Sequence, residues 1–126
     1  MKDYLTLADI LGMHTILVET YGGSDGVREW GGVEAAAFRP QCGYYTDVIE
    51  QACAILESLL MNHPFIDGNK RTAWACCDVF LRINGITLNV DDMEMYEMIL
   101  SWITSPPSER WQKMVADIRK AASSAV

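Results

Sequence analysis

Apolar residues recur at helical spacing along most of the chain. The densest segment is Thr72–Leu81, where Asp78 is the only charged residue and hardly any polar face is left. A helix that is apolar nearly all round is typical of the centre of a domain. We therefore expect the other helices to pack around this segment.

Polar residues that favour helix ends divide the rest of the chain into further amphipathic segments. In order, the pattern predicts a helix from Thr6 to Gly22, a short helix from Val33 to Phe38, a helix that opens at Thr46, the central helix capped by Asp67, a small extended segment at 86–90, a helix capped by Asp91 and a last helix capped by Ser108. The tail AASSAV is expected to be frayed. The sum is an all-α fold, a compact bundle of about six helices around a central buried helix.

Two features of the N-terminal third have more than one interpretation. His14 falls on the apolar stripe of the first helix, where a histidine is more often a hydrogen-bonded core residue than a catalyst. The segment 22–32, GGSDGVREWGG, is long enough for a functional loop, but a plain connector between helices is the favoured interpretation.

Length and composition favour one folded domain over residues 1–126. Half of the residues are hydrophobic, and 4 tryptophans and 7 methionines are ample material for a core. Acidic residues near the start argue against a secretory signal, and no apolar run approaches the ~20 residues of a membrane span. We therefore expect a soluble cytoplasmic protein with no membrane partner.

Charge and cysteine usage argue against two common kinds of site. The formal net charge of −7 would repel nucleic acid, so no direct nucleic-acid contact is expected, whereas a basic protein partner would be attracted. The 4 cysteines form no CxxC pair, and only His14 and His63 could accompany them as metal ligands. A structural zinc site is therefore disfavoured, and Cys76 and Cys77 are expected to be buried reduced thiols.

The candidate chemistry is concentrated just before the central helix, in HPFIDGNKR at residues 63–71. Lys70 and Arg71 put two cations in the first turn of that helix, where each opposes the helix dipole by roughly 0.3–1 kcal/mol. An anion at the same place removes the conflict, because free backbone N–H groups and both side chains can hold it. The pattern therefore predicts a phosphate site.

Each polar residue of this turn suits one role in phosphate transfer. His63 is the candidate general base, because imidazole titrates near neutral pH. Asp67 is the candidate Mg²⁺ ligand, since a nucleotide polyphosphate brings a hard cation that prefers carboxylate oxygens. The candidates for holding the phosphates are the main-chain N–H groups of Gly68 and Asn69 and the side chains of Lys70 and Arg71.

These residues also have purely structural interpretations. His63 and Asp67 could cap the helices on either side of the turn. Lys70 and Arg71 could form a solvated face, and any one of the four alone is more often structural than functional. A Walker-type nucleotide site is excluded, because GNKRT lacks the long glycine loop and the final Lys-Ser/Thr pair.

The turn resembles the motif of the Fic/Doc family, and within it that of the Doc (death on curing) toxins. The Doc motif is His-x-Phe-x-Asp-(Gly/Ala)-Asn-Lys-Arg, and residues 63–71 read HPFIDGNKR. The upstream GVREWGGVEAAAFRPQ and the downstream LRINGITLNVDDMEMYEMIL are similar to the segments that flank the motif in Doc proteins. The resemblance therefore extends well beyond the motif on both sides.

The resemblance implies a Fic fold in which His63 activates the hydroxyl of a target protein, Phe65 anchors the turn in the core and Asp67 binds Mg²⁺. It also implies a target-docking flap at 39–45, by position alone. The residues that match the phosphate-binding turn of the family are Gly68, Asn69 and Arg71.

Two departures from the majority Fic pattern, His-Pro-Phe-x-(Asp/Glu)-Gly-Asn-Gly-Arg-x-x-Arg, bear on which group is transferred. Lys70 replaces the last glycine of that pattern, and Trp74 replaces its second arginine. Doc proteins share the lysine and are understood to bind ATP reversed, so that the gamma phosphate passes to a threonine of elongation factor Tu and translation stops. The resemblance therefore implies a protein kinase that uses ATP and Mg²⁺ and acts as a toxin.

Three other functions stay open. One is an AMP transferase that tolerates Lys70, another is a catalytically silent Fic-like binding module, and the net charge disfavours the third, a nucleic-acid binder. The inhibitory Fic pattern (Ser/Thr)-x-x-x-Glu-(Gly/Asn) has near matches at 15–20 and 105–110, but both lack the final Gly or Asn. A separate antitoxin chain is therefore the expected inhibitor, and the acidic surface suits a basic one.

Overall fold

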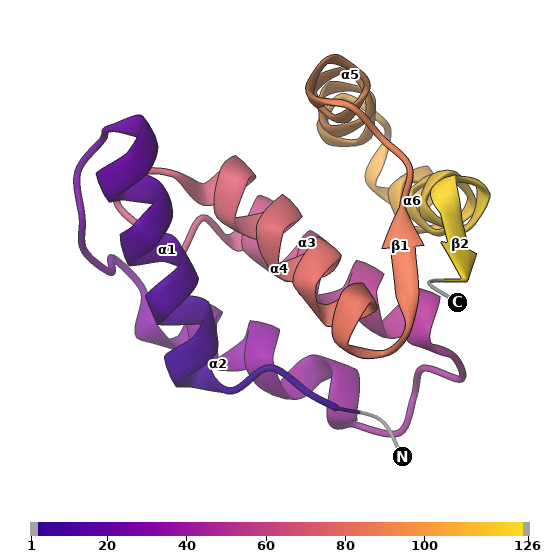
Figure 1. Ribbon diagram of the computed structural model, residues 1–126, viewed down its shortest axis with the longest axis horizontal. Helices are drawn as coiled ribbons and strands as arrows, with labels where there is room; N and C mark the ends of the chain where they lie inside the picture. The colour runs from indigo at the N-terminus through magenta and orange to yellow at the C-terminus, as the bar shows by residue number, and fades with distance from the viewer. Residues whose placement is uncertain (1–2, 125–126) are drawn as a thin grey trace.

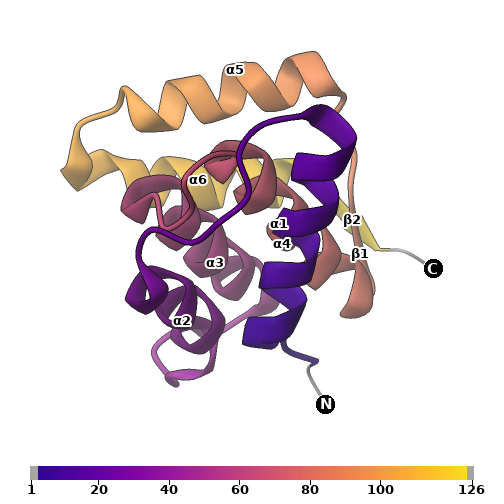
Figure 2. The ribbon, with the colours of Figure 1, turned by 90° about the vertical axis from the view of Figure 1, so that its left-hand side faces the viewer.

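Helices α3 (Val48–Asn62) and α4 (Asn69–Ile83) lie side by side at the centre of the structure, a computed structural model that describes residues 3–124 (Figure 1). The remaining elements are α1 (Leu7–Tyr21), α2 (Trp30–Phe38), the 3-10 helix η1 (Arg39–Gln41), β1 (Ile86–Leu88), α5 (Asp92–Ile103), α6 (Pro107–Ala121) and β2 (Ala122–Ser124). Helix α1 packs on α4, α2 packs on α3, and α5 lies over α6 along one side of the bundle (Figure 2). The predicted all-α bundle of about six helices is confirmed.

The central motif helix α4 is buried on one side only. Its buried residues are Thr72, Ala73, Cys76, Cys77, Phe80 and Leu81. Residues on another side of this helix, among them Trp74 and Asp78, are only partly buried because they line a cleft. Helix α3 is the more enclosed of the pair, with buried residues on nearly all of its faces.

Several helix ends differ from the sequence-based expectation. Asp47, and not Thr46, caps α3, since its side chain accepts the N–H of Glu50 at 2.8 Å. Helix α6 begins at Pro107, one residue before the expected cap Ser108, because proline suits the first helical position. Helix α2 begins at Trp30 and not at Val33. The capping box of Thr6 and Asp9 and the stop at Gly22 are confirmed for α1.

The C-terminal tail is ordered where a frayed end was expected. Ala122–Ser124 pairs antiparallel with Ile86–Leu88, and the carbonyl of Ala121 accepts the N–H of Asn89 at 3.0 Å. The last part of that tail, residues 125 and 126, lies outside the described residues. The ladder is a non-local contact, which composition alone could not predict. None of the helices between residues 3 and 124 combines the length and hydropathy that a membrane span requires.

Candidate active site

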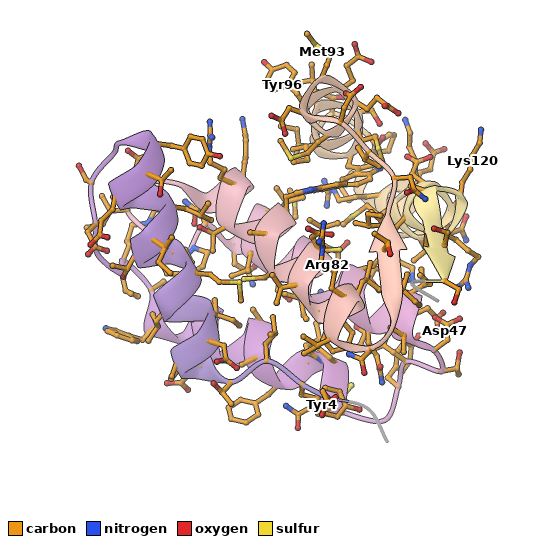
Figure 3. The ribbon with its side chains drawn as sticks, in the orientation of Figure 1. Tyr4, Asp47, Arg82, Met93, Tyr96 and Lys120 are labelled. Atoms are coloured by element: carbon orange, nitrogen blue, oxygen red, sulfur yellow. The ribbon has the colours of Figure 1, made fainter. Side chains whose placement is uncertain are left out.

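A cleft of about 870 Å³ opens between the start of α4, one face of α5 and the end of α1. It is lined by all the polar residues that the sequence singled out: His63, Asp67, Gly68, Asn69, Lys70 and Arg71. Helix α5 contributes the mostly apolar residues Met95, Tyr96, Ile99, Leu100 and Ile103 to the lining, and Trp74 of α4 joins them. Tyr96 projects from α5 beside Met93 (Figure 3), and its side chain is largely exposed. The cleft is therefore lined by the polar motif residues of the turn and by mostly apolar side chains of α4 and α5, beside which Asp78 and Asp92 also lie.

His63 stands at the cleft in an unusual backbone conformation. It ends α3 with φ 46° and ψ 56°, the left-handed region that a side chain rarely adopts, and Pro64 follows. Such a conformation costs of order 1–3 kcal/mol and persists only where neighbouring groups hold it. Here Arg28 Nη2 donates to the His63 carbonyl at 2.6 Å. Pro64 was expected to keep both Asn62 and His63 out of regular helix, but only His63 is outside, since Asn62 is the last residue of α3.

The loop between α1 and α2 occupies residues 22–29 of the segment 22–32, and it packs against the motif. It runs antiparallel to the motif, and Val27 pairs with Phe65 as an isolated bridge. The Pro64 carbonyl accepts the N–H groups of Arg28 at 2.8 Å and Glu29 at 3.0 Å. The loop therefore connects two helices and also holds the motif, through backbone groups that any residue type possesses.

Asn69 closes the turn through its side chain. Its Oδ1 accepts the N–H of Phe65 and its Nδ2 donates to the Phe65 carbonyl, both at 3.0 Å. The Phe65 side chain is fully buried, as the resemblance implied for a core anchor. The amide of Asn69 thus joins the start of α4 to the strand-like segment before it.

Asp67 presents its carboxylate to the cleft with each oxygen held by one backbone N–H. Gly68 donates to Oδ1 at 2.9 Å and Ser24 donates to Oδ2 at 3.2 Å. Two sequence-based expectations change. Gly68, with φ 78°, is the N-cap residue of α4 in place of Asp67. Its N–H is already bonded to Asp67, so the phosphate cradle that we expected from Gly68 and Asn69 loses one donor.

The two cations of the first turn differ in their surroundings. Both are exposed and both line the cleft. The Arg71 guanidinium lies over the ring of Tyr21, with Cζ 3.9 Å from the ring centroid. Among the described residues no side chain caps α4, so the N-terminal N–H groups of that helix remain available to an anion. Tyr21 was missed by sequence reasoning, since only the fold brings the end of α1 to this turn.

Comparison with known proteins agrees with the motif. The Fic/DOC family profile matches residues 4–81. The chain is 38% identical over 111 residues to Toxin Doc of Mycolicibacterium smegmatis, an alignment that covers 83% of each protein. The chain belongs to the Fic/Doc family. It is also 29% identical over 105 residues to Protein kinase doc of Escherichia phage P1, across 80% of this chain and 82% of the phage protein.

Trp74 occupies the place of the second arginine of the majority Fic pattern. It lines the cleft and stacks on Trp102, with ring centroids 6.4 Å apart and an angle of 22°. Trp102 is fully buried, and its Nε1 donates to Asp117 at 2.8 Å. This part of the cleft in this Fic/Doc protein therefore offers a firmly packed aromatic surface and no cation.

None of the residues of the strip at 39–45 lines the cleft. Arg39 packs against the second half of α3, where its Nη1 donates to the Ala54 carbonyl and to Ser58 Oγ. Arg39 Nη2 donates to Glu57 at 2.8 Å, and its guanidinium lies near the rings of Tyr45 and Trp111. These contacts hold the strip on α3 and α6, and a docking role for it stays a prediction.

Proposed function

We propose that this protein is a Doc-type toxin that transfers the gamma phosphate of ATP to a threonine hydroxyl of elongation factor Tu. The observation that carries the proposal is the common placement of His63, Asp67, Lys70 and Arg71 in one cleft. The names of the two relatives, a toxin and a protein kinase, support the same function. A translation factor as target agrees with the expected cytoplasmic location.

His63 acts as the general base. Its imidazole lines the open cleft, where the hydroxyl of a protein target can reach it. Removal of the hydroxyl proton makes the oxygen a better nucleophile toward the terminal phosphorus, and a positioned base contributes typically 10²–10⁴-fold to such a step. The left-handed backbone of His63, which Arg28 holds, ends α3 at this residue. The side chain of His63 is therefore kept at the cleft.

Lys70 and Arg71 neutralise the phosphates. Phosphoryl transfer leaves most of the catalytic work to positioning and to charge stabilisation. Both side chains rise from the uncapped start of α4, so the helix dipole and the cations act on the same anion. The conflict between two cations and the helix dipole disappears when a phosphate group is bound.

The site suits one Mg²⁺ ion that keeps most of its water. No cluster of three or more His, Cys, Asp or Glu side chains occurs among residues 3–124, so an all-protein metal cage is not formed there. Mg²⁺ in nucleotide sites needs only one or two carboxylates besides the phosphate oxygens. Asp67 meets that need, because each of its oxygens accepts only one backbone N–H. The bound ion would screen the charge that develops on the phosphate oxygens.

The choice of the gamma phosphate rests on Lys70 and Trp74. The lysine side chain takes space where the majority Fic pattern has a glycine. The indole of Trp74, which is packed on the buried Trp102, cannot attract outer phosphates as the second Fic arginine would. Both features favour a nucleotide whose terminal phosphate lies at the motif turn and whose adenine base lies along the cleft.

Neutralisation by a cognate antitoxin completes the proposal. The chain has 17 acidic residues against 10 basic ones, so a basic partner would be attracted. Co-purification of the chain with the product of a neighbouring reading frame, and loss of growth arrest on their co-expression, would test this part.

Labelled ATP separates the candidate activities. The purified chain is incubated with elongation factor Tu, Mg²⁺ and ATP that is labelled at either the gamma or the alpha phosphate. We expect gamma label on the target, and none with His63→Ala. Alpha label on the target would replace the kinase by an AMP transferase. Growth arrest that persists in His63→Ala, with no label from either ATP, would indicate a silent binding module.

A further inference from the structure

The peptide between Asp67 and Gly68 sits at the centre of the catalytic turn. Its carbonyl accepts a hydrogen bond from His14 Nε2 at 2.7 Å, and its N–H donates to Asp67 Oδ1 at 2.9 Å. The C=O and N–H of a planar trans peptide point in opposite directions. The hydrogen bond from His14 therefore fixes the orientation of this peptide plane. The N–H group of the same peptide in turn holds the Asp67 carboxylate.

His14 is itself held by the motif. Its side chain is 2% exposed. Its ring stacks on that of Phe65 with centroids 3.8 Å apart and an angle of 7°. A Cβ on Gly68 would lie 3.7 Å from the His14 Nε2 and Cδ2 atoms, so the imidazole also packs directly beneath the glycine. The ring plane and the Nε2 direction are thus both determined by residues of the turn.

The hydrogen-bond chemistry allows one arrangement of the Nε2 atom. A carbonyl oxygen can only accept, so Nε2 must carry a hydrogen. The other nitrogen, Nδ1, lies 3.5 Å from Oδ1 of the exposed Asp25 in the loop at 22–32. Whether or not Nδ1 is protonated, Nε2 stays the donor to Asp67.

We propose that His14 is a positioning residue for the catalytic turn. It orients the Asp67–Gly68 peptide through its Nε2–H group and so sets the direction of the Asp67 carboxylate and of the first turn of α4. It lies beneath the turn and touches no reacting atom. The proposal rests on the proposed function only where it concerns activity, since the hydrogen bond and its effect on the turn can be measured without ATP.

Nuclear magnetic resonance tests the hydrogen bond directly. In the protein with ¹⁵N-labelled histidine, we expect the His14 nitrogen shifts of an imidazole with a hydrogen on Nε2. His14→Phe keeps the stacked ring and removes the donor, whereas His14→Gln keeps an amide donor near the position of Nε2. We expect the amide resonances of Gly68 and Asn69 to shift in His14→Phe and to return toward the wild-type values in His14→Gln. A His14 ring with hydrogen only on Nδ1 would overturn the proposal.

Activity supplies the second readout. A misplaced catalytic group costs on the order of 10²-fold for ~1 Å, so we expect His14→Phe to lower kcat by about 10- to 100-fold with a smaller change in KM for ATP. His14→Gln should restore most of the loss. Ser58→Ala is the matched control, because it removes a buried hydrogen bond to Arg39 outside the cleft.

The outcomes distinguish the two proposals. A wild-type chain that transfers no phosphate, but shows the Nε2–H form and the amide shifts, would contradict the proposed function and leave His14 in its role. An active wild type in which His14→Phe and Ser58→Ala lose equally little activity would reject the role of His14. If His14→Phe fails to fold, His14→Gln and the nitrogen shifts of the wild type still decide the question.

Discussion

Gly23 approaches the Asp67 carboxylate too closely for any side chain to fit between them. A Cβ on Gly23 would lie 2.7 Å from Asp67 Oδ2, whereas a Cβ on Gly22 would meet nothing within 4 Å. The two glycines have φ values of 117° and 88°, so alanine is strained at either position. The pair therefore separates a steric effect on Asp67 from a backbone effect on the loop.

We expect Gly23→Ala to displace the Asp67 carboxylate and to raise the Mg²⁺ concentration needed for half-maximal activity, with about a tenfold or greater loss in kcat/KM. Gly22→Ala should keep the Mg²⁺ dependence of the wild type and lose only stability, by ~1 kcal/mol or more. Mg²⁺ titrations of activity and thermal unfolding of both variants provide the test. Equal Mg²⁺ dependence in the two variants would count against Asp67 as the metal ligand.

The cysteines divide into one exposed and three buried thiols. Burial raises the pKa of Cys53 and Cys77, and it raises the pKa of Cys76 to about 12. Because the thiolate is the reactive form, these three should be inert in the folded protein. We expect a thiol reagent to modify Cys42 alone in the native chain and all 4 cysteines after unfolding. Cys42→Ser should abolish the native reaction, and fast modification of a second thiol would contradict the burial.

At the scale of elements, α1 serves as the support of the catalytic turn. Its residues His14, Val18 and Tyr21 follow one helical stripe, and each contacts a different part of the turn: the Asp67 carbonyl, the Gly68 Cα region and the Arg71 guanidinium. The apolar spacing placed His14 on a core face, but it did not include Tyr21, which is largely exposed. The supporting role of α1 is visible only in the structure, where the helix packs on α4.

The ring of Tyr21 should hold the guanidinium of Arg71 ready for phosphate. A cation–π contact at an exposed site is worth ~0.5–1 kcal/mol, so we expect Tyr21→Leu to raise KM for ATP by about two- to fivefold. Tyr21→Phe keeps the ring face and should behave as the wild type. Steady-state kinetics at several salt concentrations would measure the difference. If the two variants have the same KM, the ring does not position Arg71.

At the scale of the whole molecule, an ion pair ties the start of α3 to the end of α6. Arg119 Nη2 donates to Asp47 Oδ2 at 3.0 Å. Partial burial by itself would raise the pKa of Asp47, but the hydrogen bonds from the Glu50 N–H and from Arg119 lower it below its ordinary value of 3.8. A carboxyl group with a depressed pKa stabilises the fold above its unfolded pKa and loses that stabilisation as the pH falls through its folded pKa.

We therefore expect Arg119→Gln to reduce the free energy of unfolding at neutral pH by less than ~1 kcal/mol, because both partners are half-exposed. The difference from the wild type should shrink as the pH falls below 3.8, the ordinary pKa of Asp47. Lys120→Gln is the control, since Lys120 projects away from Asp47 (Figure 3). Urea unfolding from neutral to acidic pH would measure both variants, and a pH-independent difference would contradict the coupling.

The sequence by itself determined the helices and the composition of the catalytic turn. Helix spacing, caps and breaks depend on residues a few positions apart, and the six polar site residues fall within residues 63–71. Local chemistry therefore sufficed for the all-α fold and for the motif residues of the cleft, but not for the residues of α1 and α5 that complete its lining.

Only the tertiary structure decided what supports that turn. The loop at 22–32 pairs with the motif, His14 donates to the Asp67 carbonyl, Tyr21 meets Arg71, and β2 pairs with β1. These contacts join segments that lie tens of residues apart, and several use backbone groups that every residue possesses. Neither spacing nor composition predicts such partners, because the packing of the helices decides which segments lie side by side.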